Sequence, residues 1–169
     1  MKKVLRGLGS IVLVLIALLM VVAVYARMHD GPVRAFAGGT LDSGPWNDSH
    51  GIDWSFAADL PTLELQLLEP PRSRTVWMIH HDGKLFIPCG IPNFTLWKKW
   101  PHEAVANGEA VIRIEGRRYA VKLVKTDDRD EISAVRAGLA EKYDAAAPGA
   151  EEAGDLLWIF RVEPRQADA

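Results

Sequence analysis

The sequence predicts an α+β fold that is mainly β: a small antiparallel β-barrel of about six strands with two short helices, preceded by one N-terminal transmembrane helix. Three observations lead to this prediction. A long apolar run lies near the N-terminus, and neighbouring strands follow one another as hairpins. Several strands are also apolar on both faces, as expected of a sheet that encloses a core and carries helices outside. An open sandwich is the alternative, but it buries Trp77, Met78 and Trp158 less readily.

Composition narrows the possible functions. The chain has 169 residues and a net charge of -2, with 20 basic and 22 acidic residues, so it lacks the basic excess of a nucleic-acid-binding protein. Cys89 is the single cysteine, which excludes an intramolecular disulfide and a four-cysteine zinc site. A small apolar residue at a strand end is the favoured reading of Cys89 over a reactive thiol. His80 and His81 are adjacent on a strand and point to opposite faces, so we expect no metal site.

Residues 1–26 predict a transmembrane anchor or a signal peptide. Lys2, Lys3 and Arg6 precede residues 7–26, which carry no charge. At about 1.5 Å per residue, this run spans the roughly 30 Å hydrocarbon core of a bilayer. The basic flank predicts a cytoplasmic N-terminus and an extracytoplasmic C-terminal domain, periplasmic in a double-membrane bacterium. Val24-Tyr25-Ala26 also suits a signal peptidase, but the length of the run favours an uncleaved anchor.

Residues 27–60 predict an irregular arm that is rich in glycine, proline and aspartate. Its apolar residues are too many for a free linker, so we expect the arm to lie against the domain. These residues are Phe36, Leu41, Trp46, Trp54 and Phe56.

Residues 61–164 predict the barrel domain. Residues 60–68 alternate as a half-exposed strand, which the prolines after Glu69 end. Residues 74–90 predict a hairpin, because Asp82-Gly83 lies between two apolar runs and glycine tolerates the positive φ of such turns. Residues 75–80 are apolar at nearly every position, which predicts a strand covered on both faces.

The second half of the domain continues the pattern. Residues 100–107 predict a short helix with Pro101 at its first position, and residues 110–115 and 117–125 predict a second hairpin around Gly116. Residues 127–143 predict a second helix, and a loop is expected at residues 145–154. Residues 156–162 predict a last strand, and residues 165–169 form a polar tail. The inward positions expected of the hairpin and the second helix are Ile112, Ile114, Tyr119, Val121, Leu123, Ile132, Val135, Leu139 and Tyr143.

Four cations, Arg72, Arg74, Lys98 and Lys99, flank the first hairpin in sequence. If the strand that carries Arg74 lies beside the lysine loop, these cations converge on one anion, with forked hydrogen bonds from arginine and point charges from lysine. The alternatives are solvated surface charges or contacts with lipid headgroups. His80 is a further candidate for ligand contact, against the simpler reading of a packed histidine.

Several segments together resemble the flavin-binding split β-barrel superfamily, which includes the pyridoxamine 5'-phosphate oxidases and the deazaflavin-dependent nitroreductases. The resembling segments are Gly38-Gly39-x-Leu41, Asp53-Trp54-Ser55, Arg74 at the start of an apolar strand, Asp82-Gly83, Lys98-Lys99-Trp100-Pro101, residues 106–116 and Glu141-Lys142-Tyr143. The resemblance implies a split barrel that binds FMN or a deazaflavin, with the phosphate held by Arg74 and by Lys98 or Lys99. Trp77, Trp97 and Trp100 are candidates for the wall of a ring pocket, although core packing is the simpler role of Trp77. Pro88-Cys89 departs from the Tyr-Thr that is usual in the family's oxidases.

Three hypotheses for function follow. The first is a membrane-anchored flavin- or deazaflavin-dependent oxidoreductase, with Arg74, Lys98, Lys99, Trp100 and His80 as candidate cofactor-binding residues, no catalytic residue assigned, and a small or quinone-like acceptor. The resemblance also implies a homodimer with the cofactor between subunits. The second hypothesis is a non-enzymatic extracytoplasmic barrel that binds a ligand or partner. The third is a haem-binding barrel with His80 or His102 as axial ligand.

Overall fold

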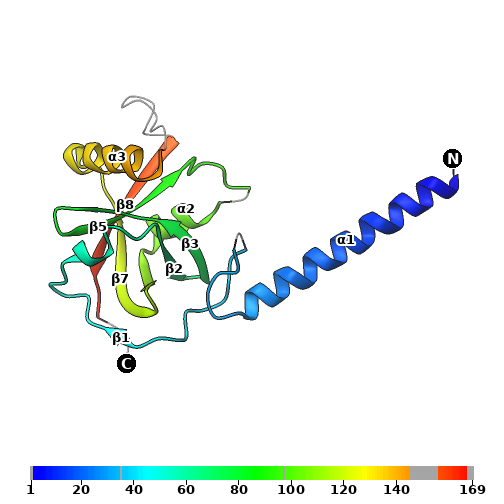
Figure 1. Ribbon diagram of the computed structural model, residues 1–169, viewed down its shortest axis with the longest axis horizontal. Coiled ribbons are helices and arrows are strands. Elements are labelled where there is room, and N and C mark those ends of the chain that lie inside the picture. Colours follow the sequence, from blue (N-terminus) through cyan, green and yellow to red (C-terminus); the bar gives the residue numbers. More distant parts are fainter. Residues whose placement is uncertain (1, 35, 97, 145–155, 167–169) are drawn as a thin grey trace.

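The computed structural model describes residues 2–34, 36–96, 98–144 and 156–166, and shows a long N-terminal helix that leads away from one β-rich domain (Figure 1). The helix, α1 (Lys2–Met28), contains the apolar stretch Gly9–Met28, whose mean hydropathy is 2.8. By length and composition this stretch is suited to cross a membrane, and a signal sequence has the same properties.

Seven strands follow one another around a single sheet in the order β3-β2-β6-β7-β8-β5-β4, and each neighbouring pair is antiparallel. The strands are β2 (Thr62–Leu68), β3 (Pro71–Trp77), β4 (Ile79–His81), β5 (Lys84–Gly90), β6 (Glu109–Ile114), β7 (Arg117–Lys125) and β8 (Leu157–Pro164). An eighth strand, β1 (Trp46–Asn47), pairs in parallel with β7.

The sheet closes into a barrel because its two end strands, β3 and β4, are continuous in the sequence. β3 and β4 lie at the two ends of the strand order, yet only Met78 separates them in the sequence. This segment pairs with β2 through its first half and with β5 through its second half. The first half of the segment, β3, is not hydrogen-bonded to the end of β5, and this gap between β3 and β5 is where the barrel is split. Counted as one strand, β3–β4 gives the six main strands that the sequence predicted.

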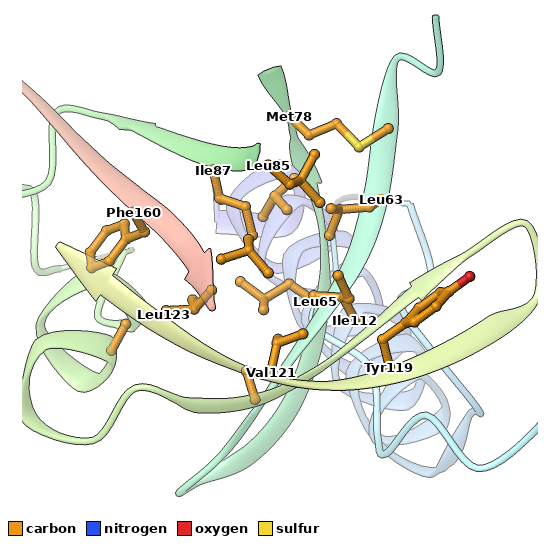
Figure 2. Packing of buried hydrophobic residues seen from close by; sticks show 14 of the residues in the cluster. Leu63, Leu65, Met78, Leu85, Ile87, Ile112, Tyr119, Val121, Leu123 and Phe160 are labelled. Carbon is orange, nitrogen blue, oxygen red and sulfur yellow. The ribbon is translucent and has the colours of Figure 1, made fainter. Parts of the chain in front are cut away.

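The inside of the barrel is filled mainly by aliphatic side chains, and aromatic rings such as Tyr119 and Phe160 lie among them (Figure 2). Leu65, Ile112 and Val121, from neighbouring strands, have no exposed surface, because alternate residues of each strand point to the same side. All five inward positions predicted for the second hairpin are buried. They are Ile112, Ile114, Tyr119, Val121 and Leu123.

β5 is apolar on both faces because α3 (Arg129–Tyr143) covers its outer side (Figure 1). Leu85 and Ile87 belong to the barrel core, whereas Phe86 packs outside the barrel with Val135 and Leu139 of α3. Both predicted helices are present, since α2 (Trp100–Ala106) also has Pro101 in its first turn. The predicted loop at 145–154 lies outside the described residues, as do residues 167–169 of the predicted tail.

The first hairpin turns at Asp82-Gly83 as predicted, where both residues have positive φ, 49° and 70°. It is shorter than the predicted hairpin over residues 74–90, because only residues 79–81 pair with β5, whereas residues 71–77 pair with β2. The expectation that residues 75–80 are covered on both faces is wrong for β3, in which Trp77 is 48% exposed. One face of Trp77 is covered by the Tyr143 ring at the end of α3, with ring centroids 4.5 Å apart, and about half of its surface stays exposed. The strand also begins earlier than expected, at Pro71, because residues 69–70 form the turn of a β2–β3 hairpin.

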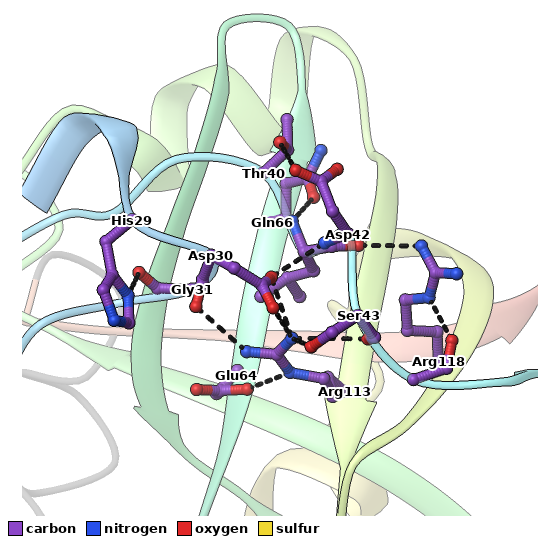
Figure 3. A network of polar contacts seen from close by, with 12 residues as sticks. His29, Asp30, Gly31, Thr40, Asp42, Ser43, Glu64, Gln66, Arg113 and Arg118 are labelled. Carbon is purple, nitrogen blue, oxygen red and sulfur yellow. Dashed lines mark hydrogen bonds and ion pairs between the residues drawn. The ribbon is translucent and has the colours of Figure 1, made fainter.

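The arm folds over the barrel through a network of polar contacts (Figure 3). Arg113 of β6 binds Asp30 and Glu64, and its guanidinium also donates to the Ser43 hydroxyl at 2.8 Å. The side-chain amide oxygen of Gln66 accepts a hydrogen bond of 2.6 Å from the Leu41 N–H. The arm is therefore attached to the domain as expected, through these polar contacts and through buried apolar residues of the arm, among them Leu41 and Trp54.

The same arm pairs with the outer edge of β3. Backbone hydrogen bonds join Gly38 to Ser73 in both directions, and Gly39 accepts a further one from Ser73. Gly38 lies so close to Gly31 that an added Cβ would collide with the Gly31 carbonyl group. This close crossing places the residues just before Gly38 beside the split in the barrel.

Candidate functional site

A cleft of about 730 Å³ lies where the barrel is split, between β3 and the end of β5. Its volume is within the range typical of small-molecule sites. The arm supplies one wall, and the loop that follows β5 supplies another. The lining residues are Arg34, Phe36, Ala37, Arg74, Thr75, Val76, Trp77, Pro88, Cys89, Gly90, Ile91, Leu96, Lys98 and Trp100.

Arg74 is the main charged group in this cleft. It lies on β3 opposite Leu65, and its guanidinium carbon is 5.8 Å from the centre of the Trp100 ring. Its Nε is buried and has no hydrogen-bond partner in the part of the chain that the structure describes. Burial lowers the pKa of Arg74 to about 10, and the Arg72 charge adds to this, whereas Glu103 opposes it. A desolvated cation with an unused donor favours an anion from outside the chain.

Lys98 brings a second cation to the cleft. Its Nζ donates a hydrogen bond of 2.7 Å to the Gly90 carbonyl oxygen, which holds the side chain across the end of β5. Cys89 lies beside it on β5 and is buried. Burial raises the pKa of the Cys89 thiol to about 11 despite the opposing charges of Lys98 and Arg74, so this thiol is protonated at neutral pH.

Aromatic rings form much of the remaining wall. Trp100, at the start of α2, is buried and packs against Phe160 with ring centroids 5.3 Å apart. Trp77 lines the cleft from β3 with about half of its surface exposed, so it is not the core residue that its sequence context favoured. Trp97 lies outside the described residues.

The structure brings together three of the five predicted cofactor-binding residues, Arg74, Lys98 and Trp100. Lys99 does not line the cleft: it is exposed at the residue that precedes α2. His80 does not line it either. It lies on β4, where its Nε2 is 3.9 Å from Asp53 Oδ1.

His102, the other residue considered for haem, is also absent from the cleft lining. A ring nitrogen of His102 lies 3.1 Å from the Pro92 carbonyl oxygen, and the ring packs edge-on against Trp158. Within residues 2–34, 36–96, 98–144 and 156–166, there is no group of three or more His, Cys, Asp or Glu side chains arranged to hold a metal ion.

The sequence reasoning missed the contribution of the arm. Arg34, Phe36 and Ala37 line the cleft because the pairing of Gly38 with Ser73 sets them beside β3. The cluster of glycines and the apolar Phe36 were visible in the sequence. The partner strand of the arm was not, because it lies more than thirty residues further along the chain.

Three solved structures resemble this fold at low identity. A protein from Listeria innocua described as a pyridoxamine 5'-phosphate oxidase superposes with a TM-score of 0.47 and 12% identity, covering 63% of this chain and 85% of that one. A NimC/NimA family protein from Clostridium acetobutylicum gives 0.45 and 16%, covering 67% and 83%. A FAD-binding protein from Mesorhizobium loti gives 0.42 and 13%, covering 71% and 93%. No family model and no curated protein matches the chain.

Proposed function

We propose that this protein is a membrane-anchored split-barrel protein that binds a flavin-type cofactor in the cleft between β3 and β5 and passes electrons to a small or lipid-soluble acceptor. The observation that carries the proposal is Arg74: a desolvated guanidinium that lines the cleft with an unused buried donor. Such a group binds a phosphate strongly, because a charge-assisted hydrogen bond replaces lost hydration.

The other lining residues support binding rather than acid–base catalysis by the chain. Arg34 and Lys98 add positive charge, and the described lining contains no carboxylate and no histidine. Cys89 is protonated, so it is not a nucleophile at neutral pH. Hydrolysis by side chains therefore lacks its usual groups, whereas a bound flavin would itself supply the electron-transfer chemistry.

Each side of the cleft has a distinct role in this proposal. Arg74 and Lys98 hold the phosphate by charge and hydrogen bonds, and both cations are near enough to Cys89 for their charges to act on its thiol. Trp77 and Trp100 provide flat apolar surface against which a planar ring packs. The arm covers the cleft at Phe36 and limits the access of water to the ring. A deazaflavin meets the same requirements when it carries a phosphate.

The anchoring part of the proposal rests on α1. Its apolar stretch extends away from the domain in Figure 1, and only 6% of it is buried by the part of the chain that the structure describes. The basic residues before this stretch favour a cytoplasmic N-terminus, and this orientation puts the domain on the other side of the membrane.

The test compares FMN with riboflavin, which lacks the phosphate, using the full-length protein in detergent. We expect FMN to bind more tightly than riboflavin. Arg74→Gln and Lys98→Gln should each weaken FMN binding by about tenfold or more, while riboflavin binding changes little. Lys99→Gln is the matched control, because Lys99 carries the same charge one residue away and does not line the cleft. Fluorescence quenching of the flavin measures each dissociation constant.

Several outcomes would contradict the proposal. Equal affinity for FMN and riboflavin would show that the cleft does not contact the phosphate group. If the protein bound neither FMN nor a phosphorylated deazaflavin, the proposed flavin-type cofactor would be wrong. A Soret band in the absorbance spectrum of the purified protein would favour haem instead. A colourless protein that binds a simple anion through Arg74 would favour the non-enzymatic ligand-binding barrel.

A further inference from the structure

The loop between β5 and α2 exposes an unusual amount of apolar surface. Ile91 is 60% exposed, Phe94 54% and Leu96 87%, and all three lie within six residues of one another. Single exposed apolar residues are common on soluble proteins, but a group of large ones on one projecting loop marks a contact surface.

The fold holds this loop in place. Pro92 is fully buried at its base, and the Ile91 N–H donates to the Leu156 carbonyl oxygen at 2.7 Å. The Lys98 N–H donates to the Phe94 carbonyl oxygen at 3.0 Å, and the Lys98 side chain bonds back to Gly90. Ile91 has a positive φ of 49°, which is costly for a β-branched residue. The apolar side chains are therefore held outward by an ordered backbone.

The loop projects on the side of the domain from which α1 leaves (Figure 1). The end of α1 is fixed to the domain, since Ala26 is fully buried and His29 accepts a hydrogen bond from Gly39. A bilayer crossed by α1 would therefore face the loop. Two lysines, Lys98 and the exposed Lys99, follow the apolar residues in sequence. A loop with exposed apolar side chains and neighbouring cations is suited to the boundary between the acyl chains and the phosphate headgroups of a bilayer.

We propose that residues 91–96 insert their apolar side chains into the surface of the bilayer that α1 crosses, as a second membrane contact beside the helix. Lys99 then contacts lipid phosphates at the edge of this contact. Ile91 and Leu96 also line the cleft, so the cleft opens at the lipid surface. An acceptor that partitions into the bilayer reaches the site without crossing water. The inference rests on the proposed anchoring by α1 and does not depend on the identity of the cofactor.

The test places an environment-sensitive NBD label at single cysteines in the full-length protein. The protein is reconstituted into phosphatidylcholine vesicles containing phosphatidylglycerol, with and without lipids that carry a doxyl quencher. The native Cys89 is replaced by alanine in every variant. Phe94→Cys reports on the loop and Leu19→Cys reports on the middle of α1. Phe56→Cys is the matched control, an aromatic residue 46% exposed on the 3₁₀ helix η1 (Trp54–Ala57), which lies on the side of the domain remote from α1 (Figure 1).

We expect the labels at positions 94 and 19 to emit at shorter wavelength and to be quenched by doxyl lipid several-fold more than the label at position 56. Quenching at position 19 without quenching at position 94 would overturn the loop contact and leave the anchor intact. Absence of quenching at position 19 would overturn the anchor, and the loop contact with it. A blue shift at position 94 without lipid quenching would also overturn the proposal, since a second protein copy would then cover the loop.

Discussion

At the scale of single residues, Arg113 of β6 lies between the inward-facing Ile112 and Ile114, yet its side chain is largely buried on the other face of the strand. Its side chain is only 10% exposed, because the arm folds across β6 and supplies Asp30 as an ion-pair partner. Burial by itself would raise the pKa of Asp30, but hydrogen bonds from Ser43, the Asp42 N–H and Arg113, with the Arg113 charge, lower it to about 2. The ion pair that attaches the arm therefore depends on the ionisation of the Asp30 carboxylate, and so on pH.

We predict that stability is lost in acid through Asp30. Its pKa falls from 3.8 in the unfolded chain to about 2 in the folded one, so its contribution is present above pH 3.8 and disappears as the pH falls towards 2. Replacing Arg113 by Met should lower the free energy of unfolding by about 2–3 kcal/mol at neutral pH and flatten this acid dependence. Urea unfolding of the full-length protein in detergent, followed by tryptophan fluorescence, measures both effects. An acid dependence that is unchanged in Arg113→Met would contradict the role given to Asp30.

At the scale of elements, α3 is held on the barrel by ion pairs and hydrogen bonds of one carboxylate as well as by apolar packing. Glu131 in its first turn accepts hydrogen bonds from Thr126 at 2.6 Å, Lys84 at 3.1 Å and Arg161 at 3.0 Å. Burial would raise the pKa of Glu131, but these donors lower it. One carboxylate therefore joins α3 to β5, to β8 and to the end of β7.

We predict that Glu131→Gln weakens the attachment of α3. The neutral side chain removes the carboxylate partner of Lys84 and one of the two carboxylate partners of Arg161, which still pairs with Glu163. We expect this loss to cost about 1–2 kcal/mol in the free energy of unfolding. Glu141→Gln is the matched control, because it makes the same chemical change at an exposed position of the same helix. Faster amide hydrogen exchange across α3 in Glu131→Gln alone would support the prediction, and equal exchange in both variants would contradict it.

The sequence predicted the positions of turns correctly where the chemistry of the turn residues determines them. Asp82-Gly83 and Gly116 gave the two expected turns, because glycine accepts positive φ there. The prediction was wrong for Trp77, since a run of apolar residues does not reveal whether a helix will cover the outer face of that strand. α3 covers the outer face of β5 at Phe86, and its last residue, Tyr143, stacks on Trp77 of β3.

At the scale of the whole molecule, barrel closure depends on the packing of residues from strands distant in sequence. Leu65 of β2 has no exposed surface and packs in the same core as Ile112 and Phe160. We predict that Leu65→Ala lowers the free energy of unfolding by about 2–5 kcal/mol through lost burial and a residual cavity. Leu96→Ala is the control, because Leu96 is 87% exposed and should change stability by less than about 0.5 kcal/mol in detergent. Denaturant unfolding distinguishes the two, and similar losses would contradict the assignment of the core.

Only part of the candidate site was visible in the sequence. Arg74, Lys98 and Trp100 were predicted together, and the structure places them around one cleft. The choice between Lys98 and Lys99 was open, because two adjacent residues look equivalent until the start of α2 turns one of them away from the cleft. The use of His80 as a binding residue stays a prediction without support from its position on β4.

The sequence by itself determined the apolar N-terminal helix, the hairpins, the two later helices and the inward faces of the second hairpin, because short-range periodicity and turn chemistry govern them. Only the tertiary structure decided where the barrel splits, that the arm walls the cleft with Arg34 and Phe36, and that Trp77 stays half exposed. These features depend on contacts between segments far apart in the chain, and local sequence patterns carry no information about such partners.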